Sequence, residues 1–165
     1  MKTILFSIPG SPPIVGNVTD SSTDEDFMKV EYPIIFLKED DKVYTIPYMP
    51  LAKLGIVLFN RKNIVSISAI DDEIKNIRNW MIEGYTGKLS QLQTEALDQV
   101  ISDRIRGFIP ANKVVELLDL SNKKFGVGLS FRAAQLMSEK LELILNDNAG
   151  EFNSNADSEI NDKIS

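Results

Sequence analysis

The sequence predicts an α+β protein, because its two halves carry different hydrophobic patterns. Residues 1–70 contain short runs of Val, Ile, Phe and Tyr, interrupted by clusters of Pro, Gly and Asp, as in strands joined by turns. Residues 71–146 space their apolar side chains three or four apart, which is typical of amphipathic helices. The 165 residues suit one compact domain or two very small ones.

The first half is predicted to form a small antiparallel β-barrel or curved sheet at the N-terminus. The links between its last four runs are too short for parallel crossovers, so the strands should pair antiparallel. Residues 9–26 are rich in turn-forming residues and are predicted to form a long loop. The expected strands are Lys2–Ile8, Val30–Lys38, Lys42–Pro47, Leu54–Phe59 and Ile64–Ile70.

The second half is predicted to form about four helices. Three of the expected starts carry an Asp or Ser, whose side chain accepts hydrogen bonds from free N–H groups, and the fourth carries a Pro that suits a first turn. The last helix should end near Asn146. The pattern fits helices that pack on one another and equally helices that cover the sheet. The expected starts are Asp71, Ser90, Pro110 and Ser130.

Residues 147–165 are predicted to be a disordered acidic tail. The stretch 146–165 holds five acids and one base, so it carries −4 of the net charge of −6. The large apolar residues of the tail are only Phe152, Ile160 and Ile164, too few to offset the entropy lost on ordering. The predicted organisation is therefore a β-rich region (1–70), a helical region (71–146) and a tail (147–165).

The chain has no histidine and no cysteine, which excludes many functions. It has no His general base, no Ser–His or Cys–His nucleophile pair, and no zinc or iron–sulfur site of the usual kind. Arg104 and Arg106 fall at the predicted C-terminus of the second helix, where cations suit the helix dipole. Gly126-Val127-Gly128 lacks the Gly-Lys-Ser/Thr of a P-loop and is interpreted as a flexible turn. The sequence thus predicts no catalytic residue, no metal site and no cofactor, and a protein that is not an enzyme. An enzyme that uses carboxylates and lysines is the third and least favoured alternative.

The predicted location is the cytoplasm. The apolar runs are far shorter than the roughly 18 residues needed to span a bilayer, so no membrane partner is expected. The run Ile4–Ile8 is broken at once by Pro9 and Gly10, which makes it too short for a signal peptide. A small chain rich in Asn, Lys and Ile with a helical appendage also favours a phage origin, in which case the location is the host cytoplasm or the virion.

Residues 34–46 contain an apolar strand, an acidic turn at Asp40-Asp41 and a second strand. Residues 57–67 contain an apolar strand, an Arg at the turn and a closing strand. These motifs are similar to the first and second signatures of the Sm-like family of small bent β-barrels that assemble into rings, which the segment 32–71 resembles. Lys62 stands where the family usually has Gly, and residues 49–53 replace its base-binding loop.

This resemblance implies a non-catalytic homo-oligomer that binds single-stranded RNA. Arg61, Lys62 and Asn63 occupy the turn where family members contact RNA near the pore. Arg and Lys would bind phosphate, Asn would bind a base edge, and Tyr48 or Tyr44 would stack on a base. The resemblance thus predicts a nucleic-acid site at Arg61, Lys62, Asn63 and Tyr48.

The alternative is a structural or assembly protein, encoded by a phage, that acts through protein–protein contacts without nucleic acid. The missing base-binding loop favours this alternative, whereas the Arg-Lys-Asn turn favours RNA. Residues 44–50 place two Pro, two Tyr and a Met close together. They form either a contact patch for a partner or an edge strand whose prolines block further pairing. The RNA-binding protein and the assembly protein are both predicted to be homo-oligomers.

Overall fold

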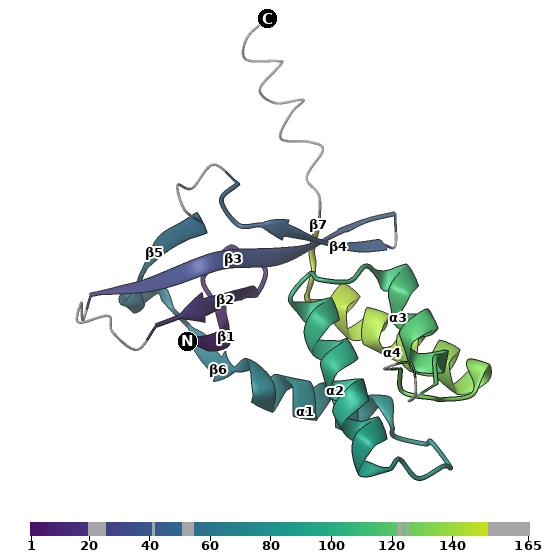
Figure 1. The fold of residues 1–165 in the computed structure, drawn as a ribbon. Helices are drawn as coiled ribbons and strands as arrows, with labels where there is room; N and C mark the ends of the chain where they lie inside the picture. Colours follow the sequence, from purple (N-terminus) through teal and green to yellow (C-terminus); the bar gives the residue numbers. More distant parts are fainter. Residues whose placement is uncertain (20–25, 41, 51–54, 122–123, 125, 152–165) are drawn as a thin grey trace, which may run out of the picture.

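The computed structural model describes residues 1–19, 26–40, 42–50, 55–121, 124 and 126–151. Six antiparallel strands are followed by four helices, as Figure 1 shows, so the predicted α+β class is confirmed. The strands are β1 (Lys2–Ser7), β2 (Ile14–Val18), β3 (Phe27–Glu39), β4 (Lys42–Pro47), β5 (Ile56–Asn60) and β6 (Ser66–Ala69), with a short β7 (Gly150–Glu151). The helices are α1 (Ile70–Met81), α2 (Gln91–Ile105), α3 (Ala111–Asp119) and α4 (Phe131–Asn148), and η2 (Arg61–Asn63) is a 3₁₀ turn.

The β3 strand is the centre of the sheet. The strand order is β4-β3-β2-β1-β6, and β5 also pairs with β3. Residues 27–31 of β3 pair with β5 and residues 34–39 pair with β4, so β4 and β5 lie end to end along one edge of β3. β7 pairs parallel with β3 at Leu37 and Lys38.

The prediction of a long loop over residues 9–26 is wrong at residues 14–18. These residues form β2, which pairs antiparallel with both β1 and β3. The run is short and contains Gly16 and Asn17, which disfavour strands in isolation. Its backbone hydrogen bonds to two neighbouring strands override that local preference. Residues 20–25 of the predicted loop lie outside the described residues.

A bulge in β3 switches which face of the sheet its side chains occupy. Tyr32 and Pro33 together lie opposite Gly16, because the pairing with β2 shifts between Val15 and Asn17. Tyr32 has a positive φ of 50°, which few residues other than glycine adopt. A Cβ on Gly16 would lie 2.2 Å from Cγ1 of Val30, so glycine is required opposite the bulge.

The first core, which we call the strand core, lies within the curl of the sheet. The rings of Phe6 on β1 and Phe59 on β5 lie 4.9 Å apart in an edge-to-face arrangement. Three strand spacings separate these strands in the sheet order, which would amount to roughly 14 Å in a flat sheet. The sheet is therefore strongly curled, but it is not closed into a barrel, because β5 and β6 do not pair with each other in the described part of the chain. The buried residues of the strand core are Ile4, Phe6, Ile14, Met28, Val30 and Phe59.

The second core, which we call the helix core, lies between the opposite face of the sheet and the four helices. The sheet contributes the buried side chains of Val15, Phe36 and Val43. Buried residues of all four helices, together with Val127 and Leu129, complete it. All four helices lie on one side of the sheet (Figure 1). They pack on one another and cover the sheet, which settles an alternative that the sequence left open.

The expected helix starts are largely as predicted. Ser90 forms a capping box at the start of α2, and Ser130 accepts a hydrogen bond from the N–H of Ala133 in α4. Pro110 is the N-cap of α3, one residue before its expected place. α1 begins at Ile70 without a side-chain cap, and Asp71 lies in its first turn.

The structure places the start of the predicted tail with the folded part of the chain. α4 continues through Asn148, and Gly150 and Glu151 pair with β3. The remaining residues of the predicted tail, 152–165, lie outside the described residues. Among the helices of the described ranges, none is long and apolar enough to cross a membrane.

Arg104 joins the sheet to two helices from a fully buried position. Its side chain on α2 is only 1% exposed. Its Nε and Nη2 atoms donate hydrogen bonds of 2.8 and 3.0 Å to the two carboxylate oxygens of Glu142 on α4. Nη2 also donates a 2.9 Å hydrogen bond to the carbonyl oxygen of Val43 on β4. The position near the C-terminus of α2 was predicted, but the burial and the ion pair were not.

We predict that Glu142→Ala lowers the free energy of unfolding by about 3–5 kcal/mol, because it leaves a buried guanidinium without its counter-charge. Chemical denaturation of the two proteins measures the difference. The matched control is Glu116→Ala, which breaks the exposed pair between Lys113 and Glu116 and should cost less than about 1 kcal/mol. Equal losses in the two variants would contradict the assignment of Arg104 as the joint between sheet and helices.

Asp98 on α2 has a pKa raised above 3.8, chiefly because burial disfavours its charged form. Arg78 on α1 opposes this shift through its charge and a hydrogen bond to Oδ2. The other oxygen, Oδ1, is buried and has no hydrogen-bond partner in the described part of the chain.

The raised pKa predicts that stability falls with rising pH between pH 3.8 and the pKa of Asp98 in the folded state. In that window the folded protein keeps a proton that the unfolded chain has lost, so removing protons favours unfolding. Denaturation of the wild type and Asp98→Asn across this range should show the wild type losing stability relative to the variant as the pH rises. The control Asp119→Asn removes an exposed carboxylate and leaves Asp98 in place. Identical pH profiles for the wild type and Asp98→Asn would rule out the effect.

Candidate functional site

The predicted RNA-contacting residues lie on the η2 turn between β5 and β6. The side-chain oxygen of Asn60 accepts a 3.0 Å hydrogen bond from the N–H of Lys62 and so caps the turn. The N–H of Arg61 donates to the carbonyl oxygen of Asp26 at 2.9 Å, and the N–H of Ile64 donates to the carbonyl oxygen of Arg61 at 3.2 Å. These bonds fix the backbone of the turn at both ends.

Arg61, Lys62 and Asn63 are all exposed on this turn, so the structure brings three of the four predicted site residues together. The side chains of Arg61 and Lys62 make no ion pair or hydrogen bond with the described residues. A fixed backbone that presents two adjacent cations and an amide to solvent has the chemistry to contact phosphate and a base edge.

Tyr48, the fourth predicted residue, is half-buried and belongs to the margin of the strand core. Its ring centroid lies 5.3 Å from that of Phe59, and its N–H donates a 2.8 Å hydrogen bond to the carbonyl oxygen of Pro33. Tyr48 therefore packs against β5 on the face of the strand core. Its contact there, Phe59, lies two residues before the η2 turn. Tyr44 on β4 is more open, with 48% of its surface exposed.

The β6 strand is an open edge of the sheet. Within the described ranges it pairs only with β1. Residues 63–70 contain no charged side chain, and Val65 and Ile67 are 73% and 56% exposed. Native proteins usually protect such edges with charges, prolines or bulges. An uncharged edge with exposed β-branched residues is a surface to which another strand can pair.

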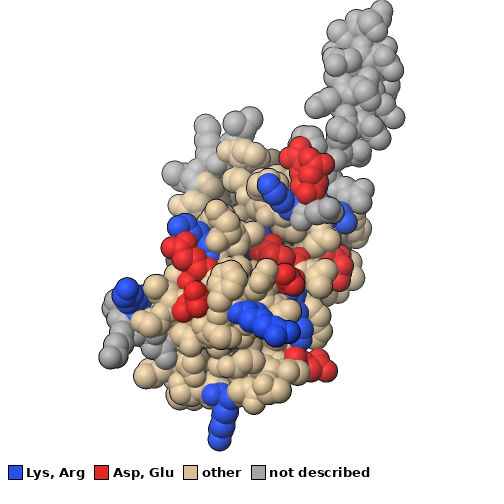
Figure 2. Space-filling view, turned by 90° about the vertical axis from the view of Figure 1, so that its right-hand side faces the viewer, with Lys and Arg blue, Asp and Glu red and all other residues tan. Residues whose placement is uncertain are grey.

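Charged side chains do not gather on the face shown in Figure 2, where basic and acidic groups are interspersed. The described residues contain no group of three or more Asp or Glu side chains placed to hold a metal ion. This distribution offers no broad basic surface on that face for a nucleic-acid backbone.

Gly126-Val127-Gly128 forms a hydrogen-bonded turn against the end of α3. Its N–H groups donate to backbone carbonyl oxygens of Ser121, Leu117 and Leu120, and Val127 is fully buried. These backbone groups are engaged within the protein, so they do not form a phosphate-binding loop.

Comparison of the chain with protein-family models and with curated protein sequences finds no match. The Sm-like resemblance therefore stays a prediction.

Two features with functional potential are not evident in the sequence. The open edge of β6 depends on which strand ends the sheet, and the pattern of residues 64–70 fits an inner strand equally well. The partners of Arg104 lie 61 and 38 residues away in the chain, so no local motif indicates them. The uncharged stretch 63–70 is the one signal that pointed towards the exposed edge.

Proposed function

We propose that this protein is a non-catalytic module that associates with further copies of itself through the open edge of β6. The observation that carries the proposal is an unprotected edge strand with two exposed apolar side chains: Ile67 within β6 and Val65 directly before it. This proposal agrees with the homo-oligomer expected from the sequence. It places the contact on β6 rather than on residues 44–50.

A second copy of the chain is the partner that the local chemistry favours. Strand addition at β6 would supply hydrogen bonds to its outward N–H and C=O groups. It would also cover the apolar side chains without placing a charge of β6 opposite a charge, because β6 itself contains no charged residue. The carboxylate of Glu73 on α1 accepts a 3.0 Å hydrogen bond from the hydroxyl of Ser68 on β6. β5 contains no charged residue either, so each copy offers a second edge of compatible chemistry.

The first prediction from this proposal is that Ile67→Lys yields a monomer. A charge on the edge strand would have to be buried in the contact between copies, whereas it stays solvated in the isolated chain. Analytical ultracentrifugation should give an oligomer for the wild type and a species of 18.5 kDa for the variant.

The matched control is Leu92→Lys on α2, which places the same charge at a residue that is 69% exposed and away from the sheet. This variant should sediment like the wild type. Thermal melting of both variants distinguishes loss of association from loss of folding. A wild type that sediments only at 18.5 kDa at micromolar concentration would refute self-association.

A second candidate function, binding of single-stranded RNA, is supported by the η2 turn. Arg61 and Lys62 present two exposed cations on a hydrogen-bonded turn, and Asn63 adds an amide. In a ring of copies the turn would recur once per subunit, so symmetry would multiply a modest local charge. The Tyr48 ring packs near Phe59. RNA binding is therefore supported more by phosphate and base-edge contacts of the turn than by stacking of a base on Tyr48.

If RNA binds at the turn, the double substitution Arg61→Ala and Lys62→Ala should weaken binding of a single-stranded oligonucleotide and flatten its dependence on salt concentration. Fluorescence anisotropy over a salt series measures both quantities. The charge-matched control combines Lys75→Ala and Lys88→Ala, which removes two exposed lysines outside the turn.

Each other outcome of this titration changes the RNA-binding candidate in a defined way. A wild type with no salt-sensitive binding leaves self-association as the function. Equal affinity in the wild type and the turn variant would place the RNA site elsewhere on the protein. Loss of affinity in both double variants would indicate a diffuse effect of net charge.

A further inference from the structure

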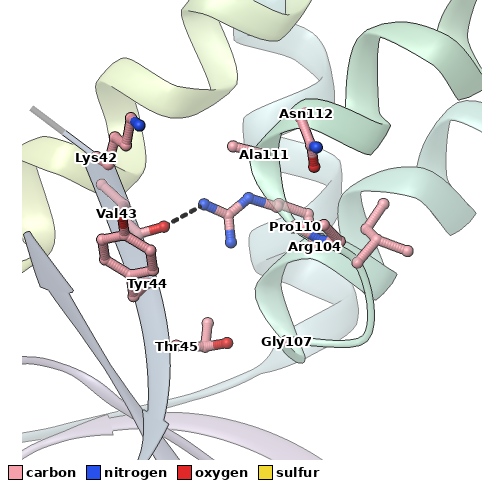
Figure 3. Close-up of a pocket in the computed structure, with 10 residues that line it drawn as sticks. Lys42, Val43, Tyr44, Thr45, Arg104, Gly107, Pro110, Ala111 and Asn112 are labelled. Carbon is pink, nitrogen blue, oxygen red and sulfur yellow. Dashed lines mark hydrogen bonds between the residues drawn. The ribbon is translucent and has the colours of Figure 1, made fainter.

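A pocket of about 480 Å³ lies between β4 and the junction of α2 and α3 (Figure 3). One wall is formed by residues 42–45 of β4, and the other by residues 109–112 at the start of α3. Gly107 lets the two walls approach, because a Cβ at this residue would lie 2.5 Å from Oγ1 of Thr45. A volume of this size is within the range of small-molecule sites.

Arg104 presents an unused hydrogen-bond donor to this pocket. Its Nε and Nη2 atoms are engaged by Glu142 and the Val43 carbonyl. Nη1 makes no hydrogen bond within the described part of the chain. Figure 3 shows the guanidinium between the two walls, with one terminal nitrogen bonded to Val43 and the other directed into the open space above Thr45.

A donor in this position is available to a partner from outside the protein. The Arg104 side chain is only 1% exposed, but Nη1 is not one of the buried polar atoms that lack a hydrogen-bond partner, so it is accessible from the pocket. A ligand acceptor at Nη1 would replace water there. Because Glu142 and Val43 hold the guanidinium in place, Nη1 is already oriented for an incoming acceptor.

The charges around the pocket favour an anion. The lining residues include two cations, Arg104 and Lys42, and no carboxylate. Glu142 balances Arg104 from outside the pocket, so about one positive charge, that of Lys42, remains for a ligand. The first N–H groups of α3 lie at the rim, and its N-cap, Pro110, supplies no side-chain hydrogen bond.

The rest of the pocket lining favours an anion that carries an apolar organic group. Val43, Tyr44, Ile109, Pro110 and Ala111 are also among the residues that line it, and their side chains are largely apolar. We propose that this pocket binds a small organic anion, whose charged group accepts a hydrogen bond from Nη1 of Arg104 and whose apolar body lies between β4 and α3. This site is independent of the β6 edge and of the η2 turn.

The test is a titration of the isotopically labelled full-length chain, followed by amide chemical shifts in NMR spectra. Three probes share a phenyl body: benzoate carries a carboxylate, phenyl phosphate carries a phosphate, and benzamide is neutral. We expect saturable shifts with benzoate or phenyl phosphate at the amides of residues 42–45 and 107–112, and no saturation with benzamide. The stronger of the two anions identifies the carboxylate or the phosphate as the recognised group.

Variants connect the binding to the named side chains. Arg104→Lys keeps the charge but removes the guanidinium donor, and it should abolish saturable binding. Lys42→Ala, at an exposed residue, should weaken binding about threefold, as expected for one solvent-exposed charge. Lys88→Ala removes an equal charge before the N-terminus of α2, at the opposite end of that helix from the pocket, and should have no effect.

The dispersion of the NMR spectrum shows whether each variant is folded. Should Arg104→Lys fail to fold, the comparison of Lys42→Ala with Lys88→Ala and of the anions with benzamide still decides the question. The proposal is overturned by the absence of saturable shifts with either anion, by equal binding of benzamide, or by saturable shifts that map outside the pocket. Equal weakening by the two lysine variants would also overturn it.

Discussion

The bulge at Tyr32 and Pro33 is the constraint on which the rest of the fold depends. Before it, Met28 and Val30 face the strand core, and after it, Phe36 faces the helix core. The extra residue shifts the alternation of side chains by one, because a strand reverses its faces with every residue. A single strand of 13 residues can therefore line the curled sheet with one end and support the helices with the other.

The division of β3 also explains why the sheet has open edges. β5 pairs with the first part of β3 and β4 with the second, so neither strand extends along the whole edge. The curl brings Phe59 against Phe6. β6 pairs with β1 and is the last strand of the sheet order. Since α1 begins at Ile70, directly after β6, the chain leaves the sheet before a further strand can cover that edge.

Arg104 adds buried polar interactions to the two apolar cores. Its guanidinium ties β4, α2 and α4 together through directional bonds, whereas the surrounding contacts of the helix core are non-directional. Two of its nitrogens fix the side chain and the third remains for an acceptor in the pocket. One residue thereby provides both the joint between sheet and helices and the donor of the proposed anion site.

The sequence by itself determined the α+β class, most of the elements and the presence of a turn at Arg61-Lys62-Asn63, because periodicity, helix caps and turn residues act over a few neighbouring positions. Only the tertiary structure decided that residues 14–18 are a strand, since their pairing energy comes from β1 and β3 rather than from local preference. It also decided that Tyr48 is half-buried beside Phe59 and that Arg104 meets Glu142. These contacts join residues far apart in the chain, and their geometry depends on the curl of the sheet, which no local pattern encodes.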